Sequence, residues 1–182
     1  MLKRLRRLTQ EVLHKNPWWE YRHDRYLHPD DSEGEFFYIH TPGAVFVIPE
    51  LPDGRVLMLR QFRYLNQRIS LEFVGGGLKA ELTHEQAARE ELLEEGGYEA
   101  AELIPLGWFN PMNGASDEEC HVFVARGLTP AISKPEISEE FEPVAVTFEE
   151  LSGLIQQGEI WDGMTLAAFS LYCFGTDLSK SR

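Results

Sequence analysis

The sequence predicts an α+β domain, because segments typical of antiparallel strands and segments typical of helices are mixed along the chain without strict alternation. The strand-like segments are short and apolar and are bounded by turn residues. The helix-like segments carry apolar or small residues at a spacing of three or four. With 182 residues, of which 43% are apolar and 26% charged, the chain is long enough to bury a core without disulfide or metal cross-links.

The N-terminal region is expected to form a small appendage rich in aromatic residues. Residues 1–15 carry leucine and valine at helical spacing and predict a short amphipathic helix, which Pro17 ends. Residues 18–26 alternate aromatic and charged side chains, as an edge strand would, and residues 35–40 return as a second strand after a turn at 29–34. Such a meander is too small to be stable alone, so we expect it to pack on the main domain or on a second subunit.

The remaining residues predict the elements of the main domain. Residues 44–49 are a continuous apolar segment, and the turn at Pro52-Asp53-Gly54 indicates a hairpin with a returning strand at 55–62. Thr83 is a favourable N-cap for a helix that Gly96 and Gly97 end. Further strands are expected at 70–74, 104–109, 121–125 and 143–147, and further helices at 148–157 and 164–174.

The charge balance excludes one broad class of function. Lys and Arg total 17 against 30 Asp and Glu, which gives a net charge of −13. A general nucleic-acid binder is expected to be basic, because it neutralises phosphates with surplus Lys and Arg. An acidic protein that nevertheless acts on phosphates needs a local device, such as bound cations.

The cysteines and the apolar segments indicate the cellular compartment in which the protein is expected. The two cysteines, Cys120 and Cys173, form no CxxC motif, which favours free thiols in a reducing compartment. No apolar run approaches the roughly 20 residues of a membrane span. The basic start of the chain lacks the apolar core and cleavage site of a secretory signal. We therefore expect a cytoplasmic protein with no membrane partner.

Three glutamates on the helix expected after Thr83 are candidate metal ligands. Glu91, Glu94 and Glu95 stand at positions i, i+3 and i+4, so they share one helix face. Like charges this close destabilise a bare helix, and a bound divalent cation would relieve their repulsion. Hard carboxylate oxygens suit Mg²⁺, with Mn²⁺ as an alternative. The spacing alone also fits a solvated acidic face, so both interpretations stay open.

The residues around these glutamates resemble a known motif. The segment 76–98, GGLKAELTHEQAAREELLEEGGY, resembles the Nudix box, G-x5-E-x7-R-E-U-x-E-E-x-G-U, where U is an apolar residue. Two positions depart from the motif: Leu82 replaces its first Glu, and Glu90 replaces its Arg. In the family these two residues form a structural ion pair between loop and helix. Glu81 and Arg89, each one residue earlier, are candidates to replace that pair.

The resemblance covers nearly the whole chain, from about residue 16 to residue 174. The segments GRVLMLRQFRY, LEFVGGG, NPMNGASDEECHVFVARGL and GEIWDGMTLAAFSLY are similar to successive parts of the ADP-ribose and nucleotide-sugar pyrophosphatase branch, as is NPWWEYRHD near the N-terminus. The resemblance implies a Nudix α/β/α sandwich at residues 43–178. It also implies that residues 1–42 form a β-subdomain that builds a homodimer.

The implied reaction is attack of water on one phosphorus of a nucleoside diphosphate sugar, which gives a nucleoside monophosphate and a sugar phosphate. Cations bridging the phosphate oxygens would stabilise the developing charge. By the resemblance, the metal ligands are the carbonyl of Gly75 and the carboxylates of Glu91, Glu94 and Glu95. Glu94 is also a candidate catalytic residue.

A general base is expected outside the Nudix box if the metal occupies the glutamates of the box. The polar loop 110–119 carries Glu118, which matches a family glutamate that orients or deprotonates the water. Three further acids, Glu139, Glu140 and Glu142, form a second cluster that competes for this role. A charge run before a strand is usually only solvated, so we rank that cluster lower.

The candidate substrate contacts are basic and aromatic residues. Arg63 is the best diphosphate contact, because its fork of donors suits a bidentate clamp on phosphate oxygens. It is also expected to pair with Glu72, and Arg60 is a weaker candidate. Trp18 or Trp19 offers a rigid surface for stacking a nucleobase, with dimer packing as the alternative role.

Several functions remain open at this stage. A Mg²⁺-dependent diphosphatase acting on ADP-ribose is favoured, and GDP-mannose or another nucleotide sugar is the alternative substrate. A module that binds nucleotide sugars without turning them over is a third hypothesis, which Leu82 and Glu90 favour. RNA-end processing is the weakest, because the chain has no basic track for a nucleic-acid partner.

Overall fold

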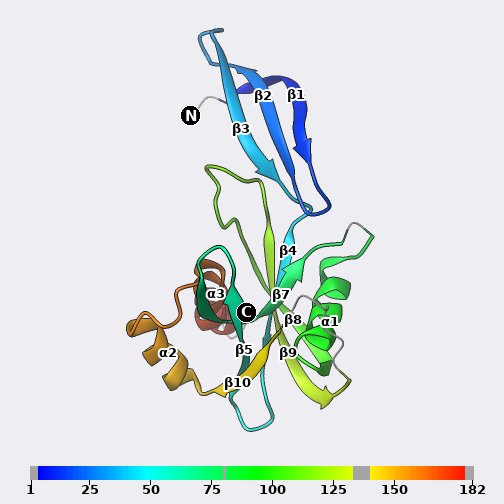
Figure 1. The fold of residues 1–182 in the computed structure, drawn as a ribbon, viewed down its shortest axis with the longest axis vertical. Helices are drawn as coiled ribbons and strands as arrows, with labels where there is room; N and C mark the ends of the chain where they lie inside the picture. Colours follow the sequence, from blue (N-terminus) through cyan, green and yellow to red (C-terminus); the bar gives the residue numbers. More distant parts are fainter. Residues whose placement is uncertain (1–3, 80, 133–139, 179–182) are drawn as a thin grey trace. The chain divides into compact units, whose positions relative to one another are not determined.

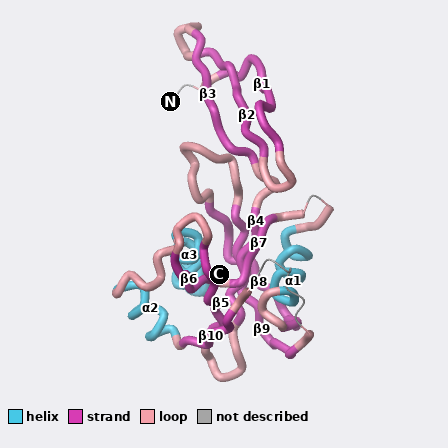
Figure 2. Tube along the Cα trace, viewed as in Figure 1, coloured by secondary structure: helices cyan, strands magenta, loops and turns pink. Residues whose placement is uncertain are grey.

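The computed structural model describes residues 4–79, 81–132 and 140–178. Within it the chain divides into two compact units. The first unit combines the N-terminal residues up to Gly43 with the segment Asn110–Glu119. The second unit combines Ala44–Phe109 with the residues from Cys120 onward. Figures 1 and 2 show the elements of each unit, which are described separately below.

The first unit is built on a three-stranded antiparallel sheet of order β1-β2-β3 (Figure 1). Its strands are β1 (Arg6–Lys15), β2 (Glu20–Leu27) and β3 (Glu33–His40). The return strand expected at 35–40 is confirmed. The expectation that residues 18–26 form an edge strand is wrong. Strand β2, which covers most of this segment, lies in the middle of the sheet and pairs with both β1 and β3.

The N-terminal helix expected at residues 1–15 is wrong, because β1 occupies most of that segment and residues 1–3 lie outside the described part. The pairing of β1 with β2 shifts register between Arg7 and Thr9 and again between Val12 and His14. Leu8 and Leu13 are therefore extra residues of two β-bulges. Each bulge restarts the alternation of faces, so the apolar residues fall at irregular spacings that imitate a helix.

Two backbone hydrogen bonds join the segment Asn110–Glu119 to β3. The N–H of Ile39 donates to the carbonyl of Ala115 at 2.9 Å, and the N–H of Asp117 donates to the carbonyl of Ile39 at 3.2 Å. Residues 39 and 116 also form an isolated parallel bridge. This segment, expected to be a polar loop, is thus part of the N-terminal unit.

In the residues that the structure describes, the second unit contains two sheets and three helices (Figure 2). The first sheet has the order β10-β5-β6 and the second the order β7-β4-β9-β8. Strands β4 and β9 are parallel, and the other pairs are antiparallel. The strands are β4 (Ala44–Pro49), β5 (Val56–Arg63), β6 (Arg68–Glu72), β7 (Val74–Gly77), β8 (Tyr98–Phe109), β9 (Cys120–Pro130) and β10 (Glu142–Val146). The helices are α1 (His84–Glu94), α2 (Phe148–Gln156) and α3 (Gly163–Leu178).

The turn expected at Pro52-Asp53-Gly54 is present, but it does not close a long hairpin. The N–H of Leu51 donates to the carbonyl of Arg55 at 2.8 Å, and Gly54 has a φ of 86°. Beyond this turn a single bridge joins Glu50 to Val56, and β4 and β5 then enter different sheets. The continuous apolar character of β4 fits this position, because all six of its residues are buried.

Helices cover both sides of the sheets in the second unit (Figure 1). Along β4, Val45 and Val47 belong to a core cluster with α1, whereas Phe46 and Ile48 belong to a cluster with residues of α2 and α3. Successive strand residues point to opposite faces, so one buried strand supplies both clusters. The expected α+β class and α/β/α layering are confirmed.

The state of the cysteines and the length of the apolar helices were also predicted from the sequence. Cys120 and Cys173 are not in a disulfide, and Cys120 is buried. None of the described helices is long and apolar enough to cross a membrane.

Candidate active site

Helix α1 and its C-cap residue Glu95 carry the three candidate metal ligands, and the start of the helix is fixed by local sequence. The hydroxyl of Thr83 accepts from the N–H of Gln86 at 3.2 Å, and the Gln86 side chain accepts from the N–H of Thr83 at 2.9 Å. This reciprocal capping box starts the helix at the expected residue. Ala87, Ala88 and Leu92 are buried against the sheet, so the helix axis is held firmly beside β7.

Strand β7 consists of Val74 and the three glycines before α1, and two of these glycines lie against the acidic face of the helix. A Cβ atom placed on Gly76 would lie 2.6 Å from the carboxyl carbon of Glu91. Only glycine therefore leaves room for this carboxylate against the strand backbone. The N–H of Gly75 donates to Oε2 of Glu95 at 3.0 Å. The resemblance implies that the Gly75 carbonyl is a metal ligand, and the structure places these glycines in a strand that lies against two of the candidate glutamates.

Lys79, in the segment between β7 and α1, contacts the acidic face. Its Nζ lies 3.2 Å from Oε2 of Glu90 and 3.7 Å from Oε2 of Glu94. The hydrogen bond to Glu90 raises the pKa of Lys79, and the charges of Glu94 and Glu91 add to this effect against the opposing effect of burial. An ion pair thus joins the segment before α1 to the helix. Its charges are exchanged relative to the Nudix box: here the basic residue precedes the helix and the acidic residue lies on it.

The ion pair expected between Glu81 and Arg89 is not the one that forms. Arg89 binds Glu85, one turn earlier on the same helix, at 3.0 Å. Its guanidinium also donates to the carbonyl of Ala100 at 2.9 Å. Arg89 therefore ties α1 to β8, and Lys79 takes the connection to the segment before the helix. The replacement of Arg by Glu90 is the sequence signal that could have pointed to a basic partner there.

Arg63 and Glu72 form the ion pair expected between β5 and β6. The Nε of Arg63 donates to Oε1 of Glu72 at 2.8 Å, and a second guanidinium nitrogen contacts Oε2. The Glu72 side chain is only 3% exposed, whereas that of Arg63 is 48% exposed. The buried Glu72 carboxylate therefore orients Arg63 from the protein interior and leaves part of the guanidinium accessible to a ligand.

The electrostatic surroundings of Arg63 include the acidic helix. The hydrogen bond to Glu72 raises the pKa of Arg63, burial opposes this rise, and the charges of Asp162 and Glu95 contribute to it. Arg63 is therefore held permanently cationic beside a candidate metal ligand. The carboxylate of Asp162, an acid that the sequence analysis did not select, accepts from the N–H of Thr165 at 2.7 Å.

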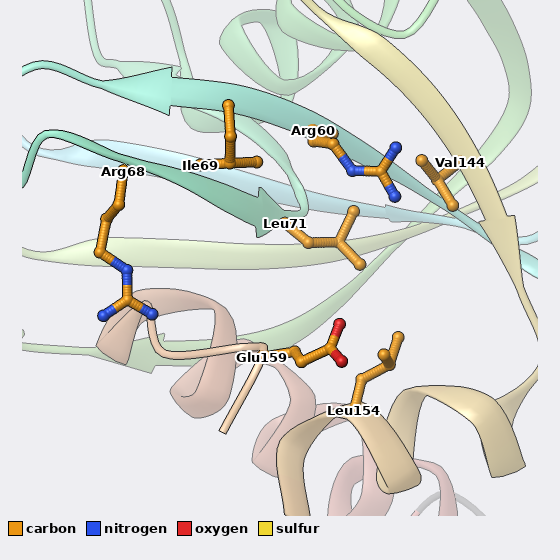
Figure 3. Close-up of a pocket in the computed structure, with 7 residues that line it drawn as sticks. All are labelled: Arg60, Arg68, Ile69, Leu71, Val144, Leu154 and Glu159. Atoms are coloured by element: carbon orange, nitrogen blue, oxygen red, sulfur yellow. The ribbon is translucent and has the colours of Figure 1, made fainter. Parts of the chain in front are cut away.

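Arg60 faces a different part of the second unit. Its guanidinium donates to Glu142 at 2.7 Å. Arg60 also lines a pocket of about 310 Å³, together with Arg68, Ile69, Leu71, Val144, Leu154 and Glu159. In Figure 3, Arg60 and Glu159 enter this pocket from opposite sides. Leu71 belongs to the core cluster on the α2 and α3 side, so this pocket is separate from the face that carries Glu72 and Arg63.

The remaining candidates belong to the first unit. The hydroxyl of Thr41 donates to Oε1 of Glu118 at 3.0 Å, and the N–H of Glu118 donates to the hydroxyl of Ser116 at 3.1 Å. Trp18 is 75% exposed and Trp19 36% exposed. Two hydrogen bonds therefore fix the position of Glu118, and both tryptophans present ring surface to the surroundings.

The acidic cluster of Glu139, Glu140 and Glu142 offers no carboxylate held as Glu118 is among its described residues. Glu139 lies outside the described residues. Glu142 is engaged by Arg60 in an ion pair of 2.7 Å. Glu140 is exposed and precedes β10. Of the acids considered as general base, Glu118 is the one whose carboxylate is fixed by a neighbouring hydroxyl.

The residues present fit a divalent cation in chemistry, although the ligands are not gathered around one point. In the described part of the chain, no three His, Cys, Asp or Glu side chains lie close enough together to hold a metal ion as they stand. Lys79 contacts Glu94, and the Gly75 N–H holds Glu95. The cradle at Gly76 nevertheless fits a fixed Glu91 carboxylate, and hard oxygen donors are what Mg²⁺ and Mn²⁺ prefer.

Comparison with known proteins settles the family. The NUDIX domain model matches residues 40–169 of this chain. The chain belongs to the Nudix family. The match includes α1 with its three glutamates, β7 and the pair formed by Arg63 and Glu72, so the resemblance expected from the sequence is confirmed.

Relatives of this Nudix protein carry related names. It is 35% identical to an ADP-ribose pyrophosphatase of Bacillus subtilis (strain 168) over 142 residues, which cover 77% of each chain. It is 27% identical to a GDP-mannose pyrophosphatase of Yersinia enterocolitica over 180 residues, which cover 91% of this chain and 93% of the relative. A solved structure titled ADP compounds hydrolase superposes with a TM-score of 0.83 over 94% of both chains, at 18% identity, and supports the fold.

Proposed function

We propose that this Nudix protein is a metal-dependent hydrolase of the diphosphate bond in a nucleoside diphosphate sugar, with ADP-ribose the favoured substrate. The products would be a nucleoside monophosphate and a sugar phosphate. The observation that carries the proposal is the acidic face of α1, where Gly76 makes room for the Glu91 carboxylate and Gly75 binds Glu95. The similarity to an ADP-ribose pyrophosphatase over 77% of the chain favours the substrate.

In this proposal Glu91, Glu94, Glu95 and the carbonyl of Gly75 hold Mg²⁺, or Mn²⁺ in its place. A bound divalent cation would neutralise phosphate oxygens and lower the pKa of the attacking water. Glu94 is also proposed as a catalytic residue, which would act on the attacking water. Strand β7 and the capped helix fix the backbone positions from which these ligands extend, and such positioning is a main contribution of a protein to this chemistry.

Arg63 is the proposed contact of the diphosphate. Its guanidinium is fixed from one side by the buried Glu72 carboxylate, so its free donors have a defined direction. Gln61 also reaches Glu72, at 3.4 Å, and helps to hold that carboxylate. A planar fork with defined direction suits two phosphate oxygens better than a flexible Lys would.

Glu118 is the proposed general base, and Thr41 is its positioning residue. The hydrogen bond from Thr41 fixes one carboxylate oxygen and leaves the other to accept a proton from water. Trp18 or Trp19 is the proposed stacking surface for the nucleobase, since both rings are partly or largely exposed. Each of these roles is tested by single substitutions.

A homodimer is the proposed assembly, with the N-terminal sheet as its contact surface. No residue of β1, β2 or β3, all three fully described, is buried. A three-stranded sheet without a buried face needs a cover to be stable. Its exposed apolar side chains include Leu8, Val12, Leu13, Tyr21, Phe36 and Phe37. A cytoplasmic location remains the expectation from the two free thiols.

GDP-mannose is the second candidate substrate, because the GDP-mannose pyrophosphatase relative aligns with 91% of this chain. Product chromatography separates the two candidates. The protein is incubated with Mg²⁺ and, separately, ADP-ribose, GDP-mannose, UDP-glucose or ATP, with Glu95→Gln as control. Nucleoside monophosphate from one sugar nucleotide, absent with the variant, supports the proposal and identifies the base. No product from any of them, with thermal stabilisation by a nucleotide sugar retained, indicates a binding module.

A further inference from the structure

Lys79 contacts both Glu90, which departs from the Nudix box, and Glu94, a proposed metal ligand. Its single ammonium group lies 3.2 Å from Glu90 and 3.7 Å from Glu94. Glu90 stands where the family motif has Arg, so the segment before α1 supplies the positive charge that the helix has lost. The N–H of Leu82, the other unusual position, donates to the carbonyl of Lys79 at 3.0 Å. Both residues that depart from the motif, Leu82 and Glu90, therefore contact this lysine.

The location of Lys79 has an electrostatic consequence for α1. Glu90 and Glu94 are separated by one helical turn, with Glu91 between them, so their negative charges repel one another. Lys79 offsets this repulsion by contacting both ends of the group. A divalent cation bound to Glu94 would offset the same repulsion with twice the charge. The two cations thus compete for one carboxylate.

We propose that Lys79 is a positioning residue that acts as the resident counter-cation of the acidic face. It holds Glu94 when no divalent cation is present, and a divalent cation must displace it from Glu94 in order to bind. Glu90, its nearer partner, keeps the displaced ammonium beside the helix. This inference rests on the proposed function only in taking Glu94 as a metal ligand. It also gives a reason why the carboxylates are not gathered around one point.

The proposal separates two properties that a purely structural lysine would change together. Removal of the ammonium takes away one positive charge that offsets the repulsion among the glutamates, so the metal-free protein becomes less stable. The same removal takes away a competitor and makes the local potential more negative, so divalent cations bind more tightly. A lysine that only supported the loop would, on removal, lower both stability and metal affinity.

The test is a titration of Mn²⁺ by electron paramagnetic resonance, at low ionic strength and without nucleotide. For Lys79→Met we expect the Kd for Mn²⁺ to fall by about fivefold, the size of effect that one unit charge exerts at about 4 Å through bulk water, because both side chains are well exposed. Melting in EDTA should occur at a lower temperature than for the unsubstituted protein. The rise in melting temperature on adding Mg²⁺ should be larger. Lys79→Gln provides a second neutral variant should Lys79→Met aggregate.

Two matched variants serve as controls. Lys79→Arg keeps the charge, so its Kd should stay within about twofold of that of the unsubstituted protein. Arg89→Met removes one positive charge from the same helix, but Arg89 is bound to Glu85 and not to Glu94. Its Kd for Mn²⁺ should also change by less than about twofold, because the lost charge does not compete for a ligand.

Several results would overturn the inference. Unchanged or weaker Mn²⁺ binding by Lys79→Met shows that the lysine does not compete with the metal. Equal tightening by Arg89→Met shows a general charge effect, and absence of Mn²⁺ binding to the unsubstituted protein removes the competition altogether. The proposed function is tested separately by turnover of a sugar nucleotide. Turnover without the expected Kd pattern refutes only the role of Lys79, and the Kd pattern without turnover refutes only the reaction.

Discussion

Substitution of Gly76 by alanine is the sharpest test of the cradle that holds Glu91. The new methyl group would lie 2.6 Å from the carboxyl carbon of Glu91, whereas ordinary contact begins at 3.4 Å. The backbone of β7 is fixed by its pairing with β4, so the flexible carboxylate is the group that moves. It must shift by about 0.8 Å, the difference between those two distances.

A shift of that size is large for a metal ligand. Coordination distances in proteins vary by only about 0.2 Å, and Mg²⁺ demands near-ideal octahedral geometry. Misplacement of a reacting group by about 1 Å costs roughly 10²-fold in rate. For Gly76→Ala we therefore expect kcat/KM with the preferred sugar nucleotide to fall by about 10²-fold. The fold should survive, because the carboxylate end of a long side chain gives way more easily than the backbone does.

Gly77→Ala is the matched control, because a Cβ atom on Gly77 would meet nothing within 4 Å. Its kcat/KM should remain within about twofold of that of the unsubstituted protein, and both variants should melt within about 3 °C of it. The assay is steady-state hydrolysis at saturating Mg²⁺, together with a thermal melt. Full activity of Gly76→Ala, or equal losses in both variants, would refute the reasoning that Glu91 needs this space.

Three further predictions concern the first unit. Glu118→Gln should lower kcat by about 10²-fold or more while leaving the Kd for Mn²⁺ unchanged, and Thr41→Val should lower kcat by about three- to tenfold through the lost hydrogen bond; a normal kcat for Glu118→Gln would move the base to another acid. Phe36→Ser combined with Phe37→Ser should yield monomers in light scattering, since both side chains are exposed on the N-terminal sheet, and a variant that remains dimeric excludes this surface. Hydrogen bonds from Lys15 and Arg22 lower the pKa of Glu20 from 4.5 to about 2, so the stabilisation from these pairs is complete above pH 4.5 and is lost as the pH falls through about 2. Glu20→Gln should flatten the dependence of the urea midpoint on pH in that range, and an unchanged curve would show that the ion pairs contribute nothing.

Much of the second unit was predictable from local sequence. The apolar run of β4, the turn at Gly54 and the cap at Thr83 each depend on residues that are neighbours in the chain, and each forms where expected. The separation of β4 and β5 into different sheets was not predictable, because it depends on which distant strands each one pairs with. Such pairing leaves no mark on the residues of the turn itself.

The acidic helix was predictable, but its cationic partner was missed for a physical reason. Glu91, Glu94 and Glu95 share a face through the helical period alone. Lys79 precedes the helix by five residues, and nothing in the period of α1 indicates how that segment folds back. The N-terminal strand was misassigned for a related reason, since the bulges at Leu8 and Leu13 are features of its pairing with β2.

The hydrogen bond between Thr41 and Glu118 joins residues 77 positions apart in the chain. During synthesis the N-terminal sheet therefore cannot acquire its last segment until the ribosome has passed Glu119. Contacts that close such long loops form late and slowly in folding. The glutamates of α1 come from a single contiguous segment and need no such closure. With the proposed roles of these residues, a nascent chain would acquire its metal ligands before its general base, so turnover would report completion of the fold and metal binding would not.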